Sequence, residues 1–314
     1  RERERMASFD RLITHNKRIS IVLFVVMTLF FIVVGGVVGT YFAGSWQGGL
    51  VVAAIVGGVY GLVAWSQGDS IVLSMSGARE ISHSDYPQLW NVVEELSIAG
   101  GIPMPRVYLI EDTAMNAFAT GRDPARSSVA ITRGLLEKCT RDELQGVMAH
   151  EMSHVRNYDI RFATLMAVMV GAIVLLCDVM RRSFLWGGGR RRSSGKGNGG
   201  GQAVVALVAV VLSIVAPILA TIIQLAVSRQ REYLADASAV ELTRNPKGLI
   251  SALNKLSYDI EPLEAANRGT QHLFIVNPFK GKKLGRDSIF STHPSLESRI
   301  ARLEALSVPS RTAE

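Results

Sequence analysis

Four long apolar segments divide the chain. Residues 21–39 and 48–66 each run for 19 residues without a charge, residues 162–179 are uncharged until Asp178, and residues 203–227 carry no charge. A helix that rises 1.5 Å per residue needs about 20 apolar residues to cross the ~30 Å hydrocarbon core of a bilayer. Four such lengths in one chain are rare among buried core helices. The pattern therefore predicts an α-helical multi-pass membrane protein.

The polar stretches between these segments give the expected organisation. In chain order we expect a basic cytoplasmic N-terminus (1–20), transmembrane hairpin 1 (21–66), the first part of a polar domain (67–161), a transmembrane or membrane-dipping hairpin 2 (162–227), and the second part of that domain (228–314). The connector of hairpin 2, residues 181–202, contains eight glycines, six Lys or Arg residues and no acid.

Composition agrees with a membrane protein. Of 314 residues, 48% are hydrophobic and 19% are charged, against about 25% charged in a typical soluble domain. Two cysteines exclude a disulfide-stapled module, and the high hydrophobicity excludes a disordered chain. A net charge of +7 suits either a nucleic-acid-binding protein or a membrane protein. Because the Arg/Gly connector follows an apolar segment, we expect it to contact the anionic lipid bilayer, and no nucleic acid.

The first polar region, residues 67–161, contains shorter predicted helices and strands. Asp85, with Gln88 three residues later, predicts a capped helix with one apolar face. Short runs rich in apolar and β-branched residues predict strands at 106–110, 117–120 and 128–132. Helices mixed with strands in this way predict an α+β domain.

The motif that carries chemistry lies on the next predicted helix. Thr140 and Glu143 form a capping box that opens this helix. Residues 150–154 then read H-E-x-x-H, and positions i and i+4 lie one turn apart on the same helix face. His150 and His154 can therefore reach one metal ion, while Glu151 can take a proton from an attacking water. Two surface histidines are the alternative, but the capping box independently predicts the helix and apolar residues supply its buried face.

Two histidines leave a catalytic zinc site one protein ligand short, because such sites use three protein ligands and a water. His272 and His293 lie far downstream and are alternative third ligands. The other source is a carboxylate, since Glu232 and Asp236 lie at i and i+4 on a helix predicted directly after the fourth apolar segment. One of them can bind the metal while the other hydrogen-bonds a ligating imidazole. Taken alone, this pair would be an ordinary solvated helix face.

Four motifs in this order resemble the HtpX-type membrane metalloproteases, relatives of the CAAX prenyl endopeptidases. They are residues 115–119 (MNAFA), 150–154 (HEMSH) followed by Asn157 and Asp159, 228–236 (SRQREYLAD) and 291–294 (STHP). The resemblance covers most of the chain and implies a zincin-like (gluzincin) metalloprotease domain. It implies one zinc ion (Zn2+) per subunit held by His150, His154 and Glu232, with Glu151 as catalytic base. It also implies a four-helix inner-membrane protein that cleaves misfolded membrane proteins in quality control.

Further residues are expected around this centre. His293 is our candidate hydrogen-bond donor to the oxyanion that forms during the reaction, because Pro294 opens a helix that could hold it rigidly. The alternative is a surface histidine at the start of that helix. Arg229 is a weaker candidate, and a cytoplasmic anchor for the membrane segment is its alternative. The segment made of Asn116, Ala117, Phe118 and Ala119 resembles the edge strand that these proteases pair with an extended substrate, although Phe118 itself fits a core position better.

Charge distribution sets the expected topology. The basic N-terminus and the loop at 41–47, which lacks Lys and Arg, put the first polar region and the active site on the cytoplasmic side. If hairpin 2 spans, the six positive charges of residues 181–202 face outward, against the positive-inside rule. We still expect it to span, because both of its apolar segments have a suitable length.

The competing class is a non-proteolytic membrane scaffold or channel subunit with a structural metal site. Structural zinc sites usually fill all four positions with protein ligands and favour cysteine. Cys139 and Cys177 do not lie near the motifs that supply the expected ligands. This difference favours a protease that acts on protein or peptide substrates, expected to be membrane proteins.

Overall fold

A computed structural model describes residues 46–169, 171, 229–264, 270, 273–276 and 294–307, together with scattered positions between 14 and 32. The apolar segment 203–227, the connector 181–202 and the residues His272 and His293 lie outside the described residues. The domain boundaries expected from the sequence stay predictions.

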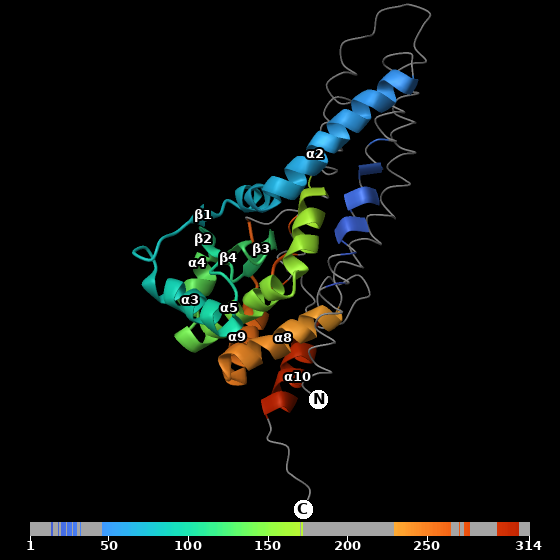
Figure 1. Ribbon diagram of the computed structural model, residues 1–314. Helices are drawn as coiled ribbons and strands as arrows, with labels where there is room; N and C mark the ends of the chain where they lie inside the picture. Colours follow the sequence, from blue (N-terminus) through green and yellow to red (C-terminus); the bar gives the residue numbers. More distant parts are fainter. Residues whose placement is uncertain are drawn as a thin grey trace, which may run out of the picture.

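A four-stranded mixed sheet forms the centre of the described part (Figure 1). Its strands are β1 (Arg79–Glu80), β2 (Arg106–Ile110), β3 (Ala117–Asp123) and β4 (Arg126–Thr132), in the order β1-β2-β4-β3. Strands β2 and β4 are parallel, and the two outer pairs are antiparallel. All three predicted strands are confirmed. The two-residue β1 was missed because so short a strand has no periodicity.

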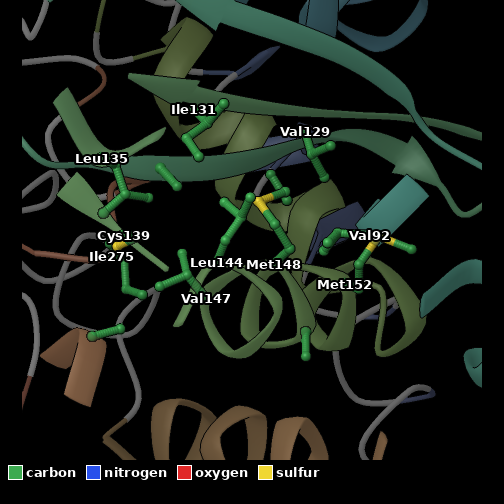
Figure 2. Packing of buried hydrophobic residues seen from close by; sticks show 14 of the residues in the cluster. Val92, Val129, Ile131, Leu135, Cys139, Leu144, Val147, Met148, Met152 and Ile275 are labelled. Carbon is green, nitrogen blue, oxygen red and sulfur yellow. The ribbon is translucent and has the colours of Figure 1, made fainter. Parts of the chain in front are cut away.

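Both faces of the sheet are covered, so side chains along each strand alternate between two cores. Helices α3 (Pro87–Gly100) and α5 (Arg141–Arg156) cover one face. Figure 2 shows Val129 and Ile131 of β4 beside Leu144 and Met148 of α5. The opposite face, which includes Phe118, packs against the last part of α2 (Trp46–Met75) and a helix over residues 159–169.

Four further helices belong to the polar domain: α4 (Arg133–Lys138), α8 (Arg229–Thr243), α9 (Pro246–Tyr258) and α10 (Leu296–Ser307). Helix α5 lies between the sheet and these later helices and packs against both α8 and α9. A side chain at Gly146 of α5 would come within 2.7 Å of the backbone nitrogen of Leu249, so glycine permits this close crossing with α9. The two polar regions of the sequence thus meet along α5.

The two expected helix caps have different outcomes. The capping box at Thr140 is confirmed, with the Thr140 amide donating to Glu143 Oε2 at 2.7 Å and the Glu143 amide donating to Thr140 Oγ1. The expected cap at Asp85 is wrong, because its carboxylate instead accepts hydrogen bonds from the amide and the hydroxyl of Ser82. Tyr86 is the N-cap of α3, and Pro87 fixes the backbone of the first helical turn.

Helix α2 carries a row of exposed apolar side chains. Val51, Ile55, Val59 and Leu62 each have more than half of their surface exposed, and α2 extends well beyond the sheet in Figure 1. Within the described ranges, no helix reaches the combination of length and hydropathy required to span a membrane. The predicted multi-pass arrangement stays a prediction.

Candidate active site

Helix α5 presents two histidines on one face. His150 and His154 are one turn apart, and their Nε2 atoms lie 3.2 Å from each other. His150 is almost completely buried, with 1% of its surface exposed, because α5 is enclosed by the sheet and by α8. The H-E-x-x-H spacing therefore produces the expected pair of converging imidazoles.

A carboxylate from α8 completes the group. Glu232 Oε2 lies 3.6 Å from His150 Nε2, and Glu232 Oε1 lies 3.6 Å from His154 Nε2. A tetrahedral ion with bonds of about 2.0–2.1 Å separates its ligand atoms by roughly 3.3–3.5 Å. The three side chains fit such an ion, and no other group of three or more His, Cys, Asp or Glu side chains in the described part of the chain does so.

Glu151 follows His150 on α5 and is buried, with 2% of its surface exposed. Burial raises the pKa of this carboxyl, because the charged form loses its hydration. The neighbouring histidines act in the opposite direction. Glu151 thus stands as a buried carboxyl beside the metal-binding group, where the sequence predicts the catalytic base.

The outer nitrogen of His150 is held by Asp236, which follows Glu232 by one turn of α8. His150 Nδ1 lies 2.9 Å from Asp236 Oδ1, so an Nδ1–H donor leaves Nε2 available for a metal. Arg299 of α10 donates to both carboxylate oxygens, with distances of 2.9 Å from Nε and 2.6 Å from Nη2. Burial opposes ionisation of Asp236, but the Arg299 charge and the hydrogen bond from His150 together outweigh it and lower the pKa of Asp236 to about 2.

His154 has a corresponding partner. Its Nδ1 lies 3.0 Å from Asp159 Oδ2, at the start of the helix over residues 159–169. Each imidazole is therefore oriented by its own carboxylate. Asp159 was noted in the sequence only as part of a family motif, and no role was predicted for it. No role was predicted for Arg299 either. The signal for Arg299 was weak, because an arginine in an amphipathic helix usually faces water.

The predicted edge strand is partly covered. Asn116 Nδ2 donates to the carbonyl of Val276, and the Ile275 amide donates to the carbonyl of Ala117 at 3.0 Å. In an antiparallel strand the outward-facing residues alternate, so the N–H and C=O of Ala119 also face away from β4. Neither has a hydrogen-bond partner among the described residues.

Phe118 lies in the core, as the sequence analysis favoured. Its ring is fully buried and packs edge-on against Phe274, with the ring centroids 5.1 Å apart. Arg229 is the first residue of α8 and is exposed. His293 precedes the described segment that leads into α10, which begins at Leu296, two residues after Pro294.

Two histidines on one helix, a glutamate from a second helix and a glutamate beside the first histidine define a metalloprotease centre, here placed against a small mixed sheet. Residues 83–307 match peptidase family M48, and the chain belongs to that family. The predicted enzyme class is therefore confirmed: the protein is a metal-dependent protease.

Bacterial relatives match almost the whole chain. A protease HtpX homologue of Listeria monocytogenes is 45% identical over 298 residues, covering 93% of this chain and 98% of the relative. A second, from Levilactobacillus brevis, is 46% identical over 301 residues, covering 95% and 99%. The crystal structure of S. mikatae Ste24p overlaps 94% of this chain and 67% of its own, with 18% identity and a TM-score of 0.47. The HtpX resemblance found in the sequence motifs is confirmed by the two HtpX homologues.

Proposed function

We propose that the protein is a zinc-dependent, membrane-embedded endopeptidase that hydrolyses peptide bonds of misfolded or damaged membrane proteins. The observation that carries the proposal is the convergence of His150, His154 and Glu232, whose ligand atoms all lie within 4.8 Å of one another. In this proposal these three side chains hold the zinc ion, and Asp236 and Asp159 orient the two imidazoles.

The buried site is suited to peptide hydrolysis. When bound, zinc supplies a Lewis acid that polarises the scissile carbonyl and makes water more acidic. Glu151 accepts a proton from the attacking water and then gives it to the leaving amine. We further propose His293 as a donor to the oxyanion and Arg229 as a weaker candidate for contact with the substrate.

Strand addition at β3 would align an extended substrate with this site. Asn116 and Ala117 already bond to residues 273–276, so we propose that substrate pairing begins at Ala119. Main-chain pairing gives little sequence specificity, which suits an enzyme that removes damaged proteins. Proline at Ala119 would remove the outward N–H and should raise KM while kcat is kept. An unchanged KM would place the substrate elsewhere.

Membrane location is supported by the four apolar segments of the sequence and by the exposed apolar row on α2. In this proposal the metalloprotease domain lies on the cytoplasmic side of the cell's inner membrane. A site close to the bilayer would meet loops and ends of membrane proteins before soluble substrates.

A chelation experiment on purified full-length protein tests the proposal. Parent protein should contain about one zinc per chain and cleave an unfolded membrane-protein substrate, and chelation should abolish cleavage until zinc is restored. Glu232→Ala should lose the metal and the activity. Glu241→Ala, at an exposed position of the same helix, is the matched control and should retain both. Cleavage that survives complete metal removal would contradict the proposal.

A further inference from the structure

A basic cavity lies away from the metal-binding group, on the other side of the sheet from α5. It has a volume of about 330 Å³ and lies between the last part of α2, the β3–β4 hairpin and the helix over residues 159–169. Among the described residues, the wall contains one acidic side chain, Asp69, and four arginines: Arg106, Arg122, Arg126 and Arg161. Its size lies at the lower end of the roughly 300–1,000 Å³ range of small-molecule sites.

The carboxylates near the cavity do not balance its arginines. Arg106 pairs with Asp69 at 2.7 Å, while Arg122 and Arg126 share Asp123 at the longer distances of 3.5 and 3.9 Å. Four guanidinium groups therefore face two carboxylates, which leaves two positive charges in excess. A doubly basic cavity of this kind would attract an anion.

Arg161 is presented to the cavity in a fixed orientation. Its Nε donates to the carbonyl of Arg122 at 2.6 Å, and its guanidinium carbon lies 5.4 Å from the centre of the Trp65 ring. No carboxylate lies within ion-pair distance of Arg161 in the described part of the chain. Its remaining N–H donors are therefore available to an anion.

The position of the cavity along α2 indicates the kind of anion. The exposed apolar side chains of α2 end at Leu62 and Val63, and the wall of the cavity begins at the next residues, Ala64 and Trp65. Tryptophan is enriched where a membrane protein crosses the lipid–water interface. If α2 lies in the membrane, as proposed above, this cavity is located at the depth of the phospholipid headgroups.

We propose that the cavity binds the phosphate of an anionic phospholipid headgroup, with the acyl chains along the apolar side of α2. Arginine suits this role, because its planar guanidinium can donate two hydrogen bonds to one phosphate. Basic pockets at the ends of membrane helices are a known way to hold anionic lipid headgroups. The site rests on the proposed membrane location but not on the protease chemistry.

Native mass spectrometry of full-length protein in mixed micelles tests this inference, with phosphatidylglycerol and phosphatidylcholine in equal amounts. Parent protein should retain phosphatidylglycerol preferentially. The double variant Arg122→Gln/Arg126→Gln should lose roughly 25-fold in this preference, at about fivefold for each arginine removed. The matched control is Arg133→Gln/Arg141→Gln, which removes two arginines paired with Glu111 and Glu95 outside the cavity, and it should change the preference less than twofold.

Further arms separate the alternatives. Arg126→Lys keeps the charge and should keep most of the preference, whereas an equal loss in the control variant would show diffuse surface charge and overturn the site. Inorganic phosphate in tenfold excess over lipid should not displace phosphatidylglycerol, and displacement would make a free anion the ligand instead. An active, metal-loaded protease without lipid preference would overturn this inference alone. Failure to cleave or to enter membranes would contradict the proposed function instead.

Discussion

At the scale of single residues, buried charges organise the active site. Arg299 is fully buried, and its guanidinium holds both carboxylate oxygens of Asp236, which in turn contacts His150 Nδ1. Arg299 Nη1 also lies 3.3 Å from the carbonyl of Ile275, in the segment that covers the start of β3. One arginine therefore links His150, a proposed metal ligand, to the edge of β3. Local sequence could not reveal this, because the contacts join α10 to segments 24 and 63 residues away.

Loss of Arg299 should weaken both stability and metal binding. Arg299→Met leaves Asp236 buried without its cation, a change that typically costs about 3–5 kcal/mol. It should also weaken zinc affinity about 10–100-fold, since His150 loses its fixed orientation. Thermal unfolding and zinc titration measure the two effects. Arg302→Met, an exposed position on the same helix, is the control.

A conservative substitution separates positioning from simple structural support. Arg299→Lys keeps the charge but not the two-pronged contact, so it should recover most of the stability and only part of the zinc affinity. If Arg299→Met binds zinc as tightly as the parent once folded, the arginine has no positioning role.

Glu151→Gln should keep the metal and lose catalysis. The amide is nearly the same size as the carboxylate, so both histidines and Glu232 remain in place, but it cannot accept the proton of water. We expect kcat to fall about 10²–10⁴-fold, the usual contribution of a general base, with unchanged zinc content. Turnover within tenfold of the parent would contradict the role assigned to Glu151.

At the scale of elements, local rules succeeded where the partners are close in sequence. The capping box of α5 depends on residues three positions apart, and the structure contains both of its hydrogen bonds. The same pattern at Asp85 failed, because its carboxylate accepts hydrogen bonds from the amide and hydroxyl of Ser82, before the helix, instead of capping the helix. The sequence also could not predict that Glu143 reaches α9, where Lys255 Nζ lies 2.6 Å from its carboxylate and Ser251 donates a second bond.

This contact predicts a pH-dependent stability. Burial opposes ionisation of Glu143, but bonds from Lys255, Ser251 and the Thr140 amide outweigh it and lower the pKa to about 2. Because the folded pKa lies below the unfolded value, the stabilisation is complete above about pH 4.5 and is lost as the pH falls towards 2. Lys255 is 38% exposed, so we expect about 1–2 kcal/mol rather than the full effect of the shift.

Melting temperatures of Glu143→Gln and parent at pH 7, 5 and 3 measure this effect. The variant should melt a few degrees below the parent at pH 7, and the difference should shrink by pH 3. Glu137→Gln, whose side chain is 63% exposed on α4, should melt like the parent throughout. If the difference in melting temperature between variant and parent grew as the pH falls, it would contradict a stabilising contribution from ionised Glu143.

At the scale of the whole molecule, the sequence predicted which regions meet but not how. Two polar regions separated by about 66 residues of apolar segments and connector were expected to form one domain, and in the described residues α5 packs directly against α8. Residue types and their spacing on two helices left the third ligand open between a carboxylate of Glu232 or Asp236 and a downstream histidine, and the family resemblance selected Glu232. Three features depend on tertiary packing, which no local pattern contains. They are the carboxylate of Asp159 that orients His154, the contact of residues 273–276 with the start of β3, and the cavity at the end of α2.

The proposed topology can be tested with two introduced cysteines. Burial raises the pKa of the Cys139 thiol to about 12, and a background that lacks both native cysteines removes any remaining reactivity. Glu94 is exposed on α3, so Glu94→Cys should react with an impermeant thiol reagent only after the membrane is opened. Ser194→Cys, in the Arg/Gly connector, should react from the outside of intact cells if hairpin 2 spans, because the connector then faces outward. Labelling of Glu94→Cys in intact cells would invert the proposed orientation, and protection of both positions would mean that hairpin 2 enters the membrane without crossing it.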